Sequence, residues 1–224
     1  MKRFTELVSD CLPHITEEFP WDVEERLDAA LAELLTDVLV RVSGNAAIAG
    51  QAPLIAEAAP ARIREELLEL FRHGVGAEVL QRAQALELMQ PMMGGYAPGK
   101  ATFRLLQELN RYFQKLGKVD EAMILAALFI DHFWQKCPVK ASLPINEVVQ
   151  SAGHLLTPYC THFRLSHGLR HQARELLVGC YRFARGPGHR GQKRFLHNPA
   201  TPLALEMFRL WTDASNGDRV LLAT

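Results

Sequence analysis

The residues best suited to chemistry gather between Cys160 and Pro199. This basic segment holds eight Lys and Arg residues against one acid, a net charge of +7 in a chain whose formal net charge is zero. The basic residues are Arg164, Arg170, Arg174, Arg182, Arg185, Arg190, Lys193 and Arg194, and the acid is Glu175. Guanidinium groups donate a fork of hydrogen bonds that matches phosphate oxygens. The segment is therefore predicted to bind an anionic partner, for which nucleic acid, a membrane surface and an acidic protein all qualify.

Helical spacing aligns three of these eight charges on one face of a helix. Ser166 is predicted to cap a helix that extends to about Ala184. One stripe of that helix carries His167, Arg170, Arg174, Tyr181 and Arg185, and the neighbouring apolar face carries Leu169, Ala173, Leu176, Cys180 and Phe183. The pattern predicts an exposed arginine ridge on which Tyr181 stacks against a base. A glycine-rich basic turn, 186–194, follows, and its glycines let the backbone approach a ligand.

Other interpretations of the same residues stay open. The ridge can be a solvated helix face, paired with the N-terminal segment, because residues 1–40 carry ten acids against three basic residues. Cys160, His162, His167 and His171 follow the pattern C-x-H-x4-H-x3-H, and the last two lie four residues apart on one helical face, as metal ligands could. No second cysteine lies nearby and arginines crowd the pattern, so no metal site is predicted.

No catalytic motif is recognisable. The chain lacks the G-x-S-x-G, H-E-x-x-H and Walker A patterns. Asp131 and His132 flank the end of an apolar helix, and we interpret them as capping or core residues. No cofactor is expected for this chain.

The elements that position the basic segment are predicted to be helices. Ala, Leu, Glu, Arg and Gln dominate, and alternating apolar runs are missing, so the fold class is all-α: a compact multi-helix body with a C-terminal basic helical region. Helices are expected over 3–12, 21–42, 60–72, 76–88, 101–116, 118–134, 144–157, 166–184 and 202–212. The stretch from Ala122 to Ile130 is apolar all round, which predicts the central core helix.

Domain organisation and location follow from composition. We predict an acidic helical segment over 1–50, a helical body over 51–138 and a basic region over 139–224, or one continuous domain. No apolar run approaches a membrane span and no secretory signal is present. Four dispersed cysteines, Cys11, Cys137, Cys160 and Cys180, are typical of reduced thiols. A cytoplasmic protein with no membrane partner is expected.

Two segments together resemble bacterial poly(A) polymerase, of the tRNA nucleotidyltransferase superfamily. The first runs from Ile55 to Met92 and resembles the helix pair that follows the family's neck. Its matching residues are Pro60 to Phe71, Gly74, Gly76, Leu86-Glu87-Leu88 and Pro91. The second resembles the RNA-binding C-terminal region. Its matching residues are Phe163-Arg164-Leu165, Arg190-Gly191, Lys193-Arg194, Leu196, Pro199, Ala204, Met207-Phe208 and Leu210.

The sequence also departs from that family. The Gly-Gly pair before Arg-Asp and the Asp-x-Asp that binds two magnesium ions are missing, and Gly94-Gly95 precedes Tyr96-Ala97-Pro98 instead. The neck motif is missing, and Leu177 to Arg182 only weakly matches the family's W-x-x-Q-x-R. The resemblance thus implies the body of such a polymerase without its catalytic head, to which ATP and magnesium would belong. Whether the chain is a fragment or a headless relative stays open.

The expected function is to hold RNA, an mRNA 3′ end or a tRNA-like molecule, for 3′-adenylation, with no catalysis by this chain alone. The candidate RNA-binding residues are Arg164, Arg170, Arg174, Tyr181, Arg182, Arg185, Arg190, Lys193 and Arg194. The alternative is a free-standing protein-interaction scaffold that docks an acidic partner.

Overall fold

The computed structural model describes residues 59–215, and every regular element in that range is helical, which confirms the all-α fold class. The predicted helices at 3–12 and 21–42, and with them the acidic segment 1–50, lie outside the described residues. The helices are α4 (Pro60–Arg72), α5 (Gly76–Ala85), α6 (Met89–Met92), α7 (Lys100–Leu116), α8 (Glu121–Lys136), the 3₁₀ helix η2 (Val139–Ala141), α9 (Ile145–His162), α10 (His167–Ala184), α11 (Gln192–Leu196) and α12 (Thr201–Ala214).

The chain divides into two compact units. The first comprises Met1–Ala97 and Phe113–Val119, and the second comprises Pro98–Tyr112 and Asp120–Thr224. The predicted domain boundaries at 50 and 138 stay predictions. The basic segment 160–199 belongs entirely to the second unit, so that unit is described at greater length.

Helix α4 organises the described part of the first unit. Pro60 occupies its first turn, where a missing N–H leaves no donor unsatisfied, and its apolar face is buried, as the spacing predicts. Phe71 on that face packs edge-on against Phe113, with ring centroids 6.4 Å apart. Helix α5 ends at Ala85, three residues before the predicted end, because Glu87 takes a left-handed φ of 60° and turns the chain.

Helix α8 lies in the core of the second unit. Every residue from Ala122 to Ile130 is buried, which confirms the prediction of a central helix. Asp120 caps it by accepting a 3.1 Å hydrogen bond from the backbone N–H of Met123. This burial accounts for the apolar surface on all sides of α8.

Asp131 on α8 holds the start of α7. One oxygen of its carboxylate accepts hydrogen bonds from the backbone N–H groups of Ala101 at 2.8 Å and Thr102 at 3.1 Å. These are two of the donors that an α-helix leaves unpaired at its N-terminus. Of the capping or core role predicted for Asp131, the structure shows capping, at the N-terminus of α7. At the other end of α7, Leu116 is 48% exposed.

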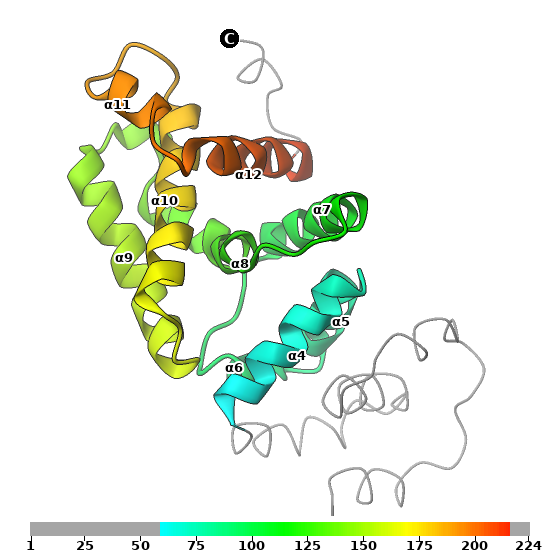
Figure 1. Ribbon diagram of the computed structural model, residues 1–224. Helices are drawn as coiled ribbons and strands as arrows, with labels where there is room; N and C mark the ends of the chain where they lie inside the picture. The colour runs from blue at the N-terminus through cyan, green and yellow to red at the C-terminus, as the bar shows by residue number, and fades with distance from the viewer. Residues whose placement is uncertain (1–58, 216–224) are drawn as a thin grey trace, which may run out of the picture. The chain divides into compact units, whose positions relative to one another are not determined.

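Helix α10 packs against α8, α9 and α12 (Figure 1). Because three helices surround its second half, the six consecutive residues from Leu176 to Tyr181 are all buried. Gly179 allows the close approach of α12: a Cβ at this position would lie 2.5 Å from the Cβ of Ala204. The predicted cap is confirmed, since Ser166 Oγ accepts a 3.1 Å hydrogen bond from the N–H of Leu169.

Helix α9 is longer than the predicted 144–157 and continues through Pro158 to His162. The chain then turns sharply into α10. Arg164 adopts a left-handed φ of 52°, and Leu165 N–H donates a 2.8 Å hydrogen bond to the carbonyl of Cys160. This closing turn fixes where α10 begins, and so fixes the basic segment relative to α9.

Candidate nucleic-acid interface

A cavity of about 260 Å³ opens beside the C-terminal end of α10, within the second unit. Its walls come from α10, from the turn 186–191, from α11 and α12, and from Ile145 at the start of α9. Three phenylalanines form an aromatic wall: the ring of Phe183 lies 5.2 Å from that of Phe195 and 5.8 Å from that of Phe208. We call this cavity the arginine–phenylalanine pocket, because Arg182, Arg185 and Arg190 also line it.

Arg182 stands over the aromatic wall. Its guanidinium carbon lies 5.1 Å from the centre of the Phe195 ring, a favourable cation–π geometry. Burial lowers the pKa of Arg182. The side chain is thus a partly desolvated cation, whose attraction to an anion is stronger than that of a fully hydrated one.

Arg185 is held by contacts with groups other than carboxylates. Its Nη1 donates a 3.5 Å hydrogen bond to the carbonyl of Leu143, and its guanidinium carbon lies 5.7 Å from the centre of the Tyr181 ring. Its Nη2 lies 3.2 Å from Nδ1 of His189. These contacts orient the guanidinium group without neutralising its charge, so Arg185 stays able to bind an anion.

The glycine-rich turn carries the remaining cations. Gly186, Gly188 and Gly191 adopt φ values of 77°, 88° and 82°, in the left-handed region that glycine tolerates best. The N–H of Gly188 donates a 2.8 Å hydrogen bond to Oε1 of Gln192, which ties the turn to α11. The charged side chains of this region are exposed: Arg190, Lys193 and Arg194.

The pocket region carries unbalanced positive charge. In residues 59–215, no carboxylate lies within ion-pair distance of any of its five cations. These cations are Arg182, Arg185, Arg190, Lys193 and Arg194. The lining of the pocket contains no Asp or Glu. Unpaired cations around an apolar cavity favour an anionic ligand over an intramolecular role.

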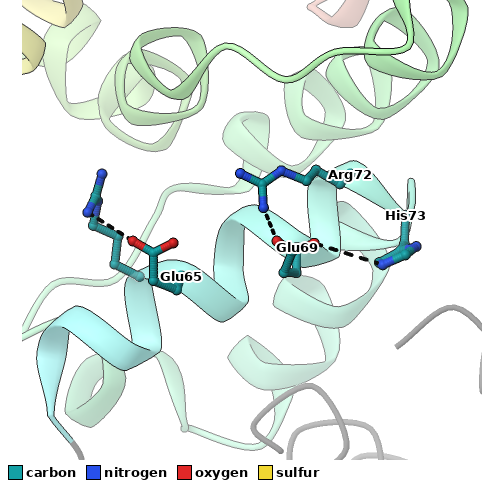
Figure 2. A network of polar contacts seen from close by, with 5 residues as sticks. Glu65, Glu69, Arg72 and His73 are labelled. Atoms are coloured by element: carbon teal, nitrogen blue, oxygen red, sulfur yellow. Dashed lines mark hydrogen bonds and ion pairs between the residues drawn. The ribbon is translucent and has the colours of Figure 1, made fainter. Parts of the chain in front are cut away.

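Several arginines elsewhere in the described chain form ion pairs with carboxylates. Arg111 binds Glu108 at 2.6 Å and Arg209 binds Glu206 at 3.1 Å. On α4, Arg72 and His73 both reach Glu69, and Glu65 pairs with a neighbouring arginine (Figure 2). The excess of positive charge in the basic segment of the sequence is therefore also an excess of unpaired cations around the pocket in the structure.

The predicted site residues fall into separate places. Arg170 and Arg174 belong to the first half of α10. Arg170 lies about 22 Å along the helix axis from Arg185. Arg174 forms an ion pair with Glu175 at 3.7 Å, and Arg170 contacts His167 at 3.0 Å. Arg164 is exposed in the turn before α10. The structure therefore groups Arg182, Arg185 and Arg190 around one pocket, but not Arg164, Arg170 and Arg174.

The prediction that Tyr181 stacks on a base is wrong. Tyr181 is completely buried, and its ring stacks on Trp134 at a centroid distance of 6.4 Å. Its hydroxyl donates a 3.4 Å hydrogen bond to the carbonyl of Leu143. Helical spacing placed Tyr181 in line with Arg174 and Arg185, but the neighbouring helices cover that part of α10 as well.

The aromatic and apolar residues of the pocket were missed in the sequence. Helical spacing predicts Phe183 on the apolar face of its helix, and no pattern singles out Phe195. Leu196 and Leu205 are 55% and 39% exposed, and both line the pocket. The available signal was the apolar pair Phe195-Leu196 directly after Lys193-Arg194, inside an otherwise polar segment.

The described residues do not group the cysteine and histidine pattern as metal ligands. No three His, Cys, Asp or Glu side chains in residues 59–215 are placed to hold a metal ion. Cys160 is 4% exposed, and burial raises its pKa to about 11, so the group is a protonated thiol at neutral pH. The ring of His162 packs edge-on against Phe163 at 4.7 Å.

None of the helices between residues 59 and 215 is both long and apolar enough to cross a membrane.

Comparison with known proteins shows that part of the chain is similar to a protein family. Residues 45–99 match the model of a protein family described as "Probable RNA and SrmB- binding site of polymerase A". The match covers fewer than half of the 224 residues. It includes all of the segment from Ile55 to Met92 that resembles bacterial poly(A) polymerase. In that stretch the chain is similar to an RNA-binding part of polymerase A. The resemblance of residues 163–210 lies outside the match and stays a prediction. No curated protein matches the chain.

Proposed function

We propose that this chain binds RNA through the five unpaired cations around the arginine–phenylalanine pocket and holds it for 3′-adenylation. The observation that carries the proposal is the local surplus of arginine beside a partly exposed aromatic wall, with no carboxylate in the pocket lining. RNA offers both complementary groups, phosphates for the guanidinium groups and unstacked bases for the rings. The match of residues 45–99 to an RNA-binding part of polymerase A supports the same ligand.

The ligand we infer is the 3′ end of an mRNA or a tRNA-like molecule. This choice rests on the resemblance to bacterial poly(A) polymerase rather than on the pocket, which has no feature that selects a sequence. We also infer that nucleotidyl transfer is performed by residues that this sequence does not contain, because metal-assisted phosphoryl transfer needs paired carboxylates such as Asp-x-Asp.

A protein partner is the second candidate, and the matched stretch favours it. Residues 59–99 carry four arginines against five glutamates, so this part of the chain has no cationic surplus. The arginines of α4 are paired with glutamates, as at Arg62 and Glu66, whose atoms are 2.9 Å apart. The family description names SrmB as well as RNA. We propose that the first unit docks a protein while the second unit binds RNA.

The RNA proposal is tested by replacing two exposed cations. We expect the double variant Arg190→Ala with Arg194→Ala to bind a fluorescent single-stranded oligo(A) at least tenfold more weakly than the unaltered chain, measured by anisotropy at low salt. The matched control is Arg111→Ala with Arg209→Ala, which removes the same charge from exposed, ion-paired sites. Equal losses in both variants, or no binding by the unaltered chain, would contradict the proposal.

The protein candidate is tested on the outer face of α5. Gln81 and Ala85 are both exposed and lie four residues apart on one face. We expect Gln81→Glu with Ala85→Glu to weaken capture of purified SrmB by the nuclease-treated chain, and to leave oligo(A) affinity unchanged. The Arg190→Ala, Arg194→Ala variant is the control and should retain the protein. Capture of SrmB that is unaffected by the α5 changes would exclude this face.

A further inference from the structure

The arginine–phenylalanine pocket has more structure than a surface for phosphates needs. Exposed large hydrophobic residues in the described chain are Leu116, Leu196 and Leu205, and the last two both line this pocket. The rings of Phe183 and Phe195 are only half-buried beside them. An apolar surface left open to water next to unpaired arginines has a cost in solvation unless a ligand covers it.

The shape and the charges of the pocket restrict the class of ligand. A cavity of about 260 Å³ is at the small end of ligand sites, large enough for one aromatic group and too small for an oligomer. Its cations, Arg182, Arg185 and Arg190, require an anionic group next to the aromatic one. A nucleotide whose base has left the stack combines a planar ring with a phosphate.

One polar group of the pocket has a fixed orientation. Gln192 lines the cavity, and its Oε1 accepts the N–H of Gly188 at 2.8 Å. Because that backbone group can only donate, the amide of Gln192 is oriented with its NH₂ group available. The pocket can therefore donate a hydrogen bond to an acceptor on a base edge, such as a ring nitrogen.

We propose that the arginine–phenylalanine pocket takes a single unstacked nucleotide of bound single-stranded RNA, its base against Phe195 and Phe183 and its phosphate on Arg182 and Arg185. The inference rests on the proposed RNA-binding function and adds to it a one-base subsite. The exposed cations Arg190, Lys193 and Arg194 attract any RNA, whereas the subsite binds only a strand whose bases are free to leave the stack.

The test removes the ring without changing the charge. We expect Phe195→Ala to lower affinity for single-stranded oligo(A) by about 5- to 100-fold, the effect of one lost base–aromatic stack. Affinity for a duplex RNA of the same length should stay the same, because its bases are already paired. The dependence on salt should also stay the same, because no phosphate contact is lost.

A second variant guards against misfolding of the first. Leu196→Ser changes an exposed side chain at the pocket, and its matched control, Leu116→Ser, changes a leucine of similar exposure on α7. We expect Leu196→Ser to lower single-strand affinity by about fourfold, the effect of about one buried methylene group. The control should have no effect. The thermal midpoint of each variant is measured alongside to confirm that it is folded.

The outcomes separate this inference from the proposed function. If Arg190→Ala with Arg194→Ala weakens binding but Phe195→Ala and Leu196→Ser do not, the chain binds RNA without a base subsite, and the inference is overturned. If no variant matters because the unaltered chain binds no RNA, the proposed function itself fails. A glutamate-rich peptide provides the third arm: an equal loss of peptide affinity in Phe195→Ala would assign the pocket to an acidic polypeptide.

Discussion

Gly179 is a position where a single methyl group should disturb the packing of two helices of the second unit. A Cβ at this residue would lie 2.5 Å from the Cβ of Ala204, a separation that unstrained side chains do not reach. In Gly179→Ala the contact must be relieved by moving α10 and α12 apart. Overpacking of this kind costs about 1–3 kcal/mol, and better helix propensity offsets up to about 1 kcal/mol of it. We expect a net loss of about 1–2 kcal/mol.

The matched variant, Ala204→Gly, removes the methyl group on the other side of this contact. Ala204→Gly alone should cost about 1–2 kcal/mol, from lower helix propensity and lost burial. Combining it with Gly179→Ala exchanges the two side chains across the contact, so the double variant should be within about 1 kcal/mol of the unaltered chain. The two changes would then have a coupling energy of about 2 kcal/mol, in the range that residues in contact show.

Urea unfolding followed by circular dichroism measures all four proteins of this cycle. The reasoning is refuted if Gly179→Ala unfolds at the same urea concentration as the unaltered chain. It is equally refuted if the two single changes simply add, since that would mean that the helices do not touch at this point. A changed slope of free energy against urea in one variant would instead report a difference in the unfolded state.

Further predictions concern the cap, a thiol, a turn and salt. Asp131→Ala should lower the free energy of unfolding by about 1–2 kcal/mol in urea, because the N–H of Ala101 loses its acceptor and the N–H of Thr102 keeps only the carbonyl of Gly99, and Asp131→Asn should lose less. The pKa of Cys160 is raised to about 11, so its contribution to the free energy of unfolding is complete below the pKa of an unfolded thiol and is lost as pH rises from about 9 to 11. Unfolding measured over a pH series should therefore show a shallower alkaline loss of stability in Cys160→Ala than in the unaltered chain. Arg164→Gly should stabilise the chain by up to about 1 kcal/mol against Arg164→Ala in thermal unfolding, because φ at this residue is 52°. Five phosphate contacts predict a slope of about −3.5 for log affinity against log salt, and Arg190→Ala with Arg194→Ala should reduce it to about −2.

The helices could be predicted where local signals agree. Pro60 begins α4, Ser166 caps α10, and the apolar stretch from Ala122 to Ile130 lies in the core. Each of these signals is contained in a few neighbouring residues. The end of α5 was harder, because it depends on a left-handed Glu87, a conformation that the residue type does not suggest.

The pocket could be predicted only in part. The surplus of arginine is a property of composition and can be seen in the sequence, and three of its members, Arg182, Arg185 and Arg190, line the pocket. The aromatic wall combines Phe183, Phe195 and Phe208 from three helices, and periodicity within one helix cannot bring such residues together. Tyr181 was misplaced for the related reason that a stripe on one helix does not show how many neighbours cover it.

Helix α11 has no buried residue of its own, whereas α10 behind it is surrounded by three helices. Amide hydrogen exchange in the second half of α10 should therefore be limited by unfolding of the whole unit, while amides of α11 exchange by local opening. The pocket would then have one rigid wall, which fixes Arg182 and Arg185, and one compliant wall carrying Phe195. Such a pair of walls can hold a phosphate at a constant position and still admit either a purine or a pyrimidine.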